Sequence, residues 1–213
     1  MIHAYDEDYL YYAQNNLGHM VDFAINTCEY SLDEFFDMFR VSNVCKQFEE
    51  GNPTYLVGKT GCELARLVIF EIKEKEIQEK DIMYMDRSPE YWLGWSLAYY
   101  VWEKNCRFDY IFRAIHPENL IEMYDTLHEA DISKFVIQID NRLKEYYDKS
   151  MLARLRTYAN LSQSMLAEKS GINIRIIQSY EQGMRDINKA QFSTIVKLAK
   201  ALNCDPIELL EKE

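Results

Sequence analysis

The chain has 213 residues, of which 48% are hydrophobic and 28% are charged, a composition typical of a folded globular protein. Its 7 glycines and 4 prolines leave few residues for the many tight turns of an all-β protein, so we expect a mainly α fold. No run approaches the roughly 20 apolar residues that cross a bilayer. Residues 1–12 are acidic and aromatic, where a signal peptide is basic and then apolar. We therefore expect a cytoplasmic protein without a membrane partner.

The net charge of −11 is distributed unevenly along the chain. Residues 1–150 carry 15 Lys and Arg against 28 Asp and Glu, a net charge of −13, whereas residues 151–213 carry 9 against 7, a net charge of +2. Phosphates would repel the acidic part, so any contact with nucleic acid is expected in the C-terminal part. Two parts of opposite charge predict two partners. We expect residues 1–147 to form an acidic helical region that binds a partner or ligand, with a further boundary near residues 70–87 left open, and residues 148–213 to form a second domain.

Five cysteines are scattered along the chain without a CxxC pair. An odd number at such spacing predicts buried, reduced thiols rather than a disulfide framework or a zinc site. They are Cys28, Cys45, Cys62, Cys106 and Cys204.

In chain order, apolar residues first recur at three- and four-residue spacing over residues 9–39, which predicts helix. Residues 54–57, after a Gly-Asn-Pro turn, are expected to be extended, and Thr60 is expected to cap the following helix. The charged residues 71–87 are expected to be solvated. Ser88 and Pro89 then have the residue types that open a helix.

Two more helices are expected before the boundary, over about residues 108–126 and 130–146. Next to them, His128, Glu129 and Asp131 could suggest a metal site, although a structural role is favoured. Earlier in the chain, residues 51–60 end in the Gly-Lys-Thr of a phosphate-binding loop, but Pro53 stands where the loop needs a glycine. We favour Thr60 as a helix cap. No nucleophile lies beside a base within a motif, so we expect no enzyme, no cofactor and no metal.

An aromatic stripe follows Pro89. Its spacing is typical of a helix face in the protein core, which we favour; the alternative is a partner-binding surface, because Trp and Tyr dominate interface hot spots. The residues are Tyr91, Trp92, Trp95, Tyr99, Tyr100 and Trp102, of which all but Tyr100 are our candidate partner contacts.

Residues 152–210 contain the capping and turn residues that are typical of several short helices. Ser162 is a typical N-cap before a helix that begins at Gln163, Gly171 stands where a turn needs a positive φ, and Asn173 is expected to cap the next helix. Further on, Asn188 and Gln191 have capping-box spacing. The expected inner faces comprise Leu152 and Leu155, then Ile176, Ile177 and Tyr180, then Phe192, Ile195, Val196, Ala199 and Leu202, and finally Leu209 and Leu210 in a fifth helix from Pro206.

This stretch resembles the phage-repressor type of helix-turn-helix, the XRE family, on Leu161-Ser162-Gln163, Leu166-Ala167, Gly171-Ile172, Ile177, Tyr180-Glu181, Gly183 and residues 198–202. The resemblance implies a five-helix DNA-binding domain whose recognition helix spans residues 173–181. It also implies a transcription repressor that binds a double-stranded DNA operator as a homodimer. The implied DNA contacts are Asn173, Ile174, Arg175, Gln178 and Ser179 toward the bases, and Gln163, Arg185 and Lys189 toward the backbone.

The N-terminal part resembles a segment found upstream of such domains in bacterial antitoxin-like regulators, through residues 88–105, Met123-Tyr124, residues 128–131 and Phe135. The genes of those regulators neighbour toxins of the ADP-ribosyltransferase-like kind. One hypothesis is therefore an antitoxin and autorepressor of a toxin–antitoxin pair, whose N-terminal region binds the toxin. The alternative is a one-component regulator that senses a small ligand through this region. A toxin partner predicts a large exposed apolar patch, and a sensor predicts an enclosed pocket of roughly a few hundred Å³.

Overall fold

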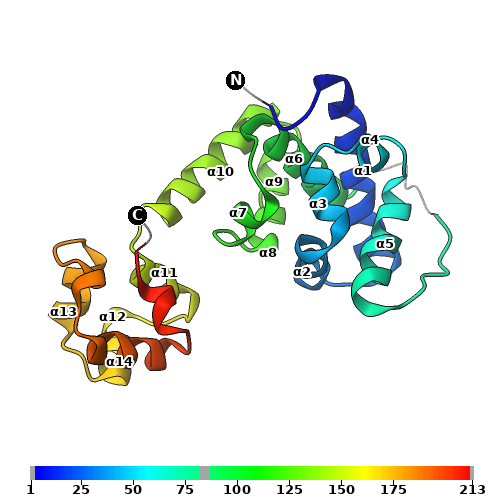
Figure 1. Ribbon diagram of the computed structural model, residues 1–213. Helices are drawn as coiled ribbons and strands as arrows, with labels where there is room; N and C mark the ends of the chain where they lie inside the picture. The colour runs from blue at the N-terminus through cyan, green and yellow to red at the C-terminus, as the bar shows by residue number, and fades with distance from the viewer. Residues whose placement is uncertain (1–2, 82–86, 212–213) are drawn as a thin grey trace. The chain divides into compact units, whose positions relative to one another are not determined.

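The structure is a computed structural model that describes residues 3–81 and 87–211. Within these ranges the regular structure is entirely helical, which confirms the mainly α fold (Figure 1). The chain divides into two compact units, Met1–Leu143 and Lys144–Glu213. No described helix has the length and apolarity needed to cross a membrane.

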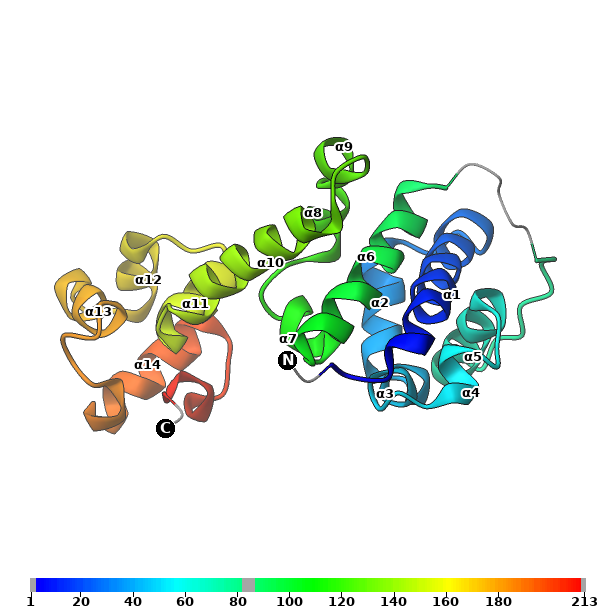
Figure 2. The ribbon, with the colours of Figure 1, turned by 90° about the horizontal axis from the view of Figure 1, so that it is seen from above.

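The N-terminal unit is centred on α1 (Leu10–Asp22), which lies between α6 (Pro89–Lys104) and α5 (Gly61–Lys73) (Figure 2). Both crossings bring backbones into direct contact. A Cβ atom added to Gly94 would lie 2.5 Å from the Leu17 carbonyl oxygen, and one added to Gly61 would lie 2.5 Å from the Asn16 carbonyl oxygen. Glycine is therefore required at these positions for the helices to approach so closely.

Five further N-terminal elements precede α5. They are η1 (Glu7–Tyr9), the π-helical turn η2 (Phe23–Thr27) that extends α1, α2 (Leu32–Val41), α3 (Asn43–Glu49) and α4 (Pro53–Leu56). Phe39, Phe48 and Phe108 are fully buried, and the Phe108 ring contacts Phe39 edge-to-face and Phe48 in a tilted arrangement. They form the aromatic core of this unit.

Two N-terminal expectations are wrong. Residues 54–57 do not extend, because the Asn52 side chain accepts a hydrogen bond from the Thr54 N–H at 3.0 Å and Pro53 takes the first helical position of α4. Residues 108–126 do not form one helix but three, α7 (Phe108–Phe112), α8 (Pro117–Ile121) and α9 (Tyr124–Leu127). Pro117 cannot donate a backbone hydrogen bond and disfavours helix in the residue before it, so α8 must start anew there.

Other expectations are met. Thr60 caps α5 in a reciprocal capping box with Glu63, and the Ser88 side chain accepts a hydrogen bond from the Tyr91 N–H at the start of α6. The last N-terminal helix, α10, spans Ile132–Tyr147. Of the aromatic stripe on α6, Tyr91, Tyr100 and Trp102 are buried, whereas Trp92, Trp95 and Tyr99 are half-buried.

The C-terminal unit contains α11 (Met151–Tyr158), α12 (Gln163–Ser170), α13 (Ile174–Glu181), η3 (Ile187–Lys189), α14 (Phe192–Leu202) and η4 (Pro206–Leu209). One side chain from each of the main helices meets in its core, with Leu152, Leu166, Ile177 and Leu198 all fully buried. The expected fifth helix is only the 3₁₀ turn η4, which nevertheless buries Leu209.

The expected inner faces of this unit need three corrections. Phe192 is 75% exposed, because it is the first residue of α14 and lies beyond the apolar stripe that begins at Ile195 and includes Leu198. Ile176 is half-buried and lies outside the core cluster. Val196 is likewise half-buried and lies outside the core cluster.

The expected capping box of Asn188 and Gln191 is also absent. Gln191 itself is the N-cap of α14, without a side-chain hydrogen bond. The Asn188 side chain instead pairs with the Glu211 backbone, accepting at 2.9 Å and donating at 3.0 Å. This pairing ties the end of the described chain to the turn before α14.

Candidate nucleic-acid interface

Local hydrogen bonds set the geometry of the α12–turn–α13 segment. The Ser162 hydroxyl oxygen accepts from the Met165 N–H at 3.1 Å at the start of α12. Gly171 ends α12 with φ +68°. No atom lies within 4 Å of an added Cβ, so glycine is favoured here because of the left-handed backbone conformation and not because a side chain would clash. Asn173 then caps α13, accepting from the Arg175 N–H at 2.9 Å. These contacts bear out the caps and the turn expected from sequence.

The predicted base readers lie on the solvent side of α13. Ile177 is fully buried, whereas Arg175, two residues before it, is exposed. Ile174, Gln178 and Ser179 are half-buried. The Ser179 hydroxyl donates to the Ile176 carbonyl oxygen at 2.8 Å, which leaves its oxygen as an acceptor.

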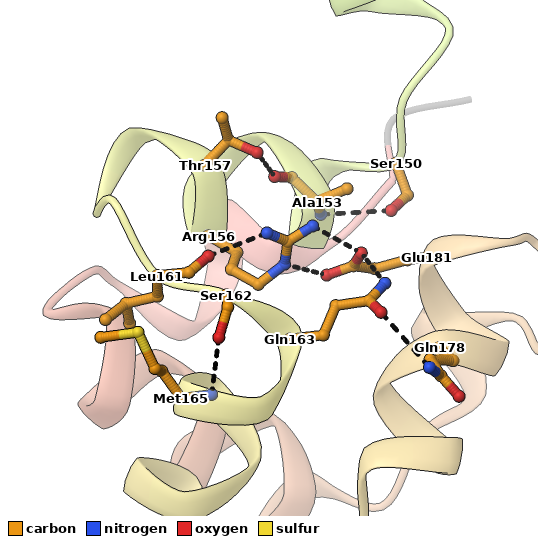
Figure 3. A network of polar contacts seen from close by, with 10 residues as sticks. All are labelled: Ser150, Ala153, Arg156, Thr157, Leu161, Ser162, Gln163, Met165, Gln178 and Glu181. Atoms are coloured by element: carbon orange, nitrogen blue, oxygen red, sulfur yellow. Dashed lines mark hydrogen bonds and ion pairs between the residues drawn. The ribbon is translucent and has the colours of Figure 1, made fainter.

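A polar network connects α13 to α11 and α12 (Figure 3). Arg156 donates from Nε to Glu181 Oε1 at 2.6 Å and from Nη2 to Oε2 at 2.9 Å, a bidentate ion pair. Gln163 Nε2 donates to the same Oε2 at 2.8 Å. Glu181 is only 6% exposed and the Arg156 side chain 17%. The hydrogen bond to Glu181 also raises the pKa of Arg156.

The network continues from Gln163 to the recognition helix. Gln163 Oε1 accepts from Gln178 Nε2 at 3.3 Å (Figure 3). Because the Gln163 amide nitrogen is committed to Glu181, its oxygen must face Gln178, which fixes the orientation of both amides. An amide has two N–H groups and two lone pairs, so each glutamine keeps hydrogen-bonding capacity for a further partner.

The two predicted backbone contacts after α13 are exposed. Arg185 is held in a turn by its backbone N–H, which donates to the Ser179 carbonyl oxygen at 3.0 Å. Lys189 Nζ lies 3.1 Å from Asp186, and its side chain is 85% exposed. Gly183 has φ +68° and allows the chain to turn between α13 and these residues.

Sequence reasoning missed the pairing of Arg156 with Glu181. Glu181 belongs to the family pattern, but Arg156 lies 25 positions before it in the chain. Periodicity shows which face of a helix is apolar and carries no information on which charged residues meet across helices. The available signal was the presence of an acidic residue, Glu181, at the end of a helix that is expected to approach phosphates.

Outside this unit, the other candidate sites have structural explanations. Thr60 serves as the cap of α5. His128 stacks on Tyr124 with ring centroids 4.5 Å apart, and its Nδ1 lies 2.7 Å from the Tyr124 carbonyl oxygen. Within residues 3–81 and 87–211, no three His, Cys, Asp or Glu side chains are grouped to hold a metal ion. All five cysteines are free thiols.

Residues 152–209 match the family model of the helix-turn-helix. No curated protein and no solved structure matches the chain. The C-terminal unit is therefore a helix-turn-helix domain, with α12 and α13 as its two defining helices. This domain supports a DNA-binding transcriptional regulator, with DNA as a partner of the C-terminal unit.

Proposed function

We propose that the protein is a sequence-specific repressor that inserts α13 into the major groove of its operator. The observation that supports this most strongly is the exposed Arg175 at the N-terminal end of a helix whose opposite end is held by the buried Arg156–Glu181 pair. Recognition helices of this type present their N-terminal residues to the bases. A rigidly held helix can place an arginine fork with the precision that bidentate recognition of guanine requires.

Each exposed side chain of α13 then has a defined role. Arg175 donates two hydrogen bonds to guanine, and Gln178 pairs with adenine. Ile174, which occupies a place often held by a polar reader, contacts a thymine methyl group. Asn173 and Ser179 complete the face toward the bases.

The remaining contacts position the domain on the duplex. Gln163 is the first residue of α12, where the unpaired N–H groups and the helix dipole favour a phosphate. Arg185 and Lys189 follow α13 and neutralise phosphates on the flanking backbone. These contacts set affinity and register and carry no sequence information.

We further propose that the protein binds its operator as a homodimer. A single eight-residue α13 reads only a few base pairs, so two copies are expected on half-sites about 34 Å apart. In vitro selection with the full chain, followed by footprinting and stoichiometry measurements, tests both proposals. We expect a palindromic site protected by two chains, which Arg175→Ala no longer selects. Selected DNA sequences without a common motif would contradict the proposal of sequence-specific binding. One chain bound to one isolated half-site would contradict the proposal of a homodimer.

A second candidate function concerns the N-terminal unit, which we propose holds a protein toxin of the ADP-ribosyltransferase-like kind. The supporting observation is an apolar strip on α5, where Leu67 is 37% and Phe70 53% exposed, one turn apart. The strip borders a groove with buried Ile77. The net charge of −13 over residues 1–150 suits a basic partner.

Co-expression with the product of the neighbouring gene tests the antitoxin proposal. We expect a stable complex that suppresses the toxicity of the partner, and we expect Phe70→Ser to weaken this complex. Ile137→Ser is the control and should leave the complex intact, because Ile137 is similarly exposed at 57% but lies on α10. If the neighbouring product neither binds nor is neutralised, the antitoxin proposal is wrong, and the one-component sensor becomes the better description of this unit.

A further inference from the structure

A pocket of about 360 Å³ lies at the N-terminal end of α6 in the N-terminal unit. Its walls come from α6, from α9 and from the first turn of α10. This volume is at the small end of the range for natural ligand sites, roughly 300–1,000 Å³. The ring-bearing residues that line it are Tyr91, Trp92, Trp95, Tyr124, His128 and Phe135.

The rings are held in place by one another. Trp92 meets Tyr124 edge-on at 5.7 Å and Phe135 edge-on at 5.4 Å, so one indole joins the three walls. Tyr124, one of the two rings that Trp92 contacts, also stacks with His128, whose ring nitrogen hydrogen-bonds the Tyr124 carbonyl oxygen. Edge-to-face and stacked contacts fix ring orientation, so these flat surfaces are preformed for a ligand.

The charge of the pocket is opposite to that of its surroundings. Arg87 is the cation at the pocket and its guanidinium lies 4.9 Å above the Tyr91 ring, while none of the described lining residues is Asp or Glu. Nearby carboxylates have contacts of their own. Glu90 accepts a hydrogen bond from Asn26 at 3.0 Å, and Asp131 accepts one from the Ser133 N–H at 2.9 Å. The side chain of Glu129 is 90% exposed and lies 3.7 Å from His128 Nε2.

We infer that this pocket binds a small planar aromatic molecule that carries one anionic group. The indoles and Tyr124 would cover the faces of one or two fused rings, and Arg87 would pair with a carboxylate or similar anion. The positive end of the α6 dipole lies on the same side and favours the same charge. This inference adds a small-molecule site to the N-terminal unit and does not depend on the proposed mode of DNA recognition.

Calorimetric titration of the full chain with 1-naphthoate and with its neutral analogue 1-naphthamide tests the ligand class. We expect one naphthoate per chain, bound at least about fivefold more tightly than the amide, because a charged hydrogen bond to a partly exposed arginine is modestly favourable. Arg87→Met should remove this preference. The control Arg113→Met, whose arginine side chain is 63% exposed after α7, should keep it.

The three tryptophans provide an independent readout. Trp92 and Trp95 line the pocket, whereas the Trp102 indole is buried against the N-terminal segment and donates to the Tyr5 carbonyl oxygen at 2.9 Å. Naphthoate should therefore shift the indole N–H resonances of Trp92 and Trp95 and leave that of Trp102 unchanged. No binding of either compound at millimolar concentration, equal affinity for acid and amide, or a shift confined to Trp102 would overturn the inference.

Discussion

Arg156 and Glu181 form a two-pronged ion pair, at 2.6 and 2.9 Å, between the first helix of the DNA-binding domain and the last residue of its recognition helix (Figure 3). The same carboxylate also accepts from Gln163 at 2.8 Å. One buried carboxylate thus holds α13 against both helices that precede it. In the proposed complex with DNA, the orientation of α13 in the groove depends on a residue that need not touch DNA.

Replacing Glu181 with alanine is expected to destabilise the C-terminal unit by about 3–5 kcal/mol, because it leaves the Arg156 guanidinium partly buried and unpaired. Hydrogen exchange of the full chain, resolved by peptide, measures this as faster exchange over residues 152–209. Peptides from residues 3–81 should exchange as before.

The matched control is Asp186→Asn, which breaks the ion pair with Lys189. That lysine side chain is 85% exposed and the pair is screened by solvent, so the change should leave exchange nearly unaltered. Equal effects of the two substitutions would show that burial of the Arg156–Glu181 pair has no special weight.

Arg175→Ala and Lys189→Ala are expected to separate specificity from affinity. Loss of a bidentate contact with guanine should cost about 1–3 kcal/mol on the operator and little on scrambled duplex. Loss of a phosphate contact should weaken both and lower the slope of log K against log salt by about one unit. Salt titrations of both variants on both duplexes measure this. An equal loss on both duplexes for Arg175→Ala would make it a backbone contact.

Gln163 and Gln178 are expected to act together in DNA binding. Gln178 Nε2 donates to Gln163 Oε1 at 3.3 Å, so Gln163→Leu frees the Gln178 amide to turn. Gln178→Leu leaves Gln163 Oε1 without this donor, while Glu181 still holds the Gln163 amide nitrogen. Operator affinities of the two single variants and the double variant should give a coupling free energy of about 0.5–1 kcal/mol. Strictly additive losses would show that the two glutamines contact DNA independently.

Gly94→Ala is expected to destabilise the N-terminal unit by about 1–3 kcal/mol, although alanine normally favours helix over glycine by about 1 kcal/mol. The added Cβ would lie 2.5 Å from the Leu17 carbonyl oxygen, and backbone cannot move aside cheaply. Urea unfolding followed by tryptophan fluorescence measures it, since all three tryptophans lie on α6.

Ser96→Ala is the control in the same helix. It removes a fully buried hydroxyl that has no hydrogen-bond partner among the described residues, so stability should stay equal or rise. If Gly94→Ala is stabilising, α1 and α6 do not cross as closely as the structure has them.

The cysteines are expected to resist alkylation in the folded protein. Burial raises the pKa of Cys28 and Cys62 to about 11 and that of Cys106 to about 12. A raised thiol pKa means that the reactive thiolate is scarce below that pH, so at pH 8 labelling should be about 100-fold slower than for an ordinary thiol. Iodoacetamide labelling followed by mass spectrometry tests this, with guanidinium-unfolded protein as the fast reference. Rapid labelling of Cys106 at pH 8 would contradict it.

The sequence by itself determined the features that depend on near neighbours. Thr60, Ser88, Ser162 and Asn173 cap the helices for which they were predicted, because a cap is a hydrogen bond to a residue two or three positions away. Gly171 adopts the predicted positive φ for the same local reason. The family pattern added the identity of the domain, which is confirmed by the match of residues 152–209 to the helix-turn-helix family model.

Only the tertiary structure decided which distant groups meet. Three features depend on how one helix lies against another. They are the pairing of Arg156 with Glu181, the crossing of Gly94 over Leu17 and the exposure of Phe192. Helical periodicity gives the direction in which a side chain points around the helix axis. It does not identify the residue of another helix that faces this side chain. Side-chain contacts between helices arise from packing of whole elements, which no spacing within a single segment encodes.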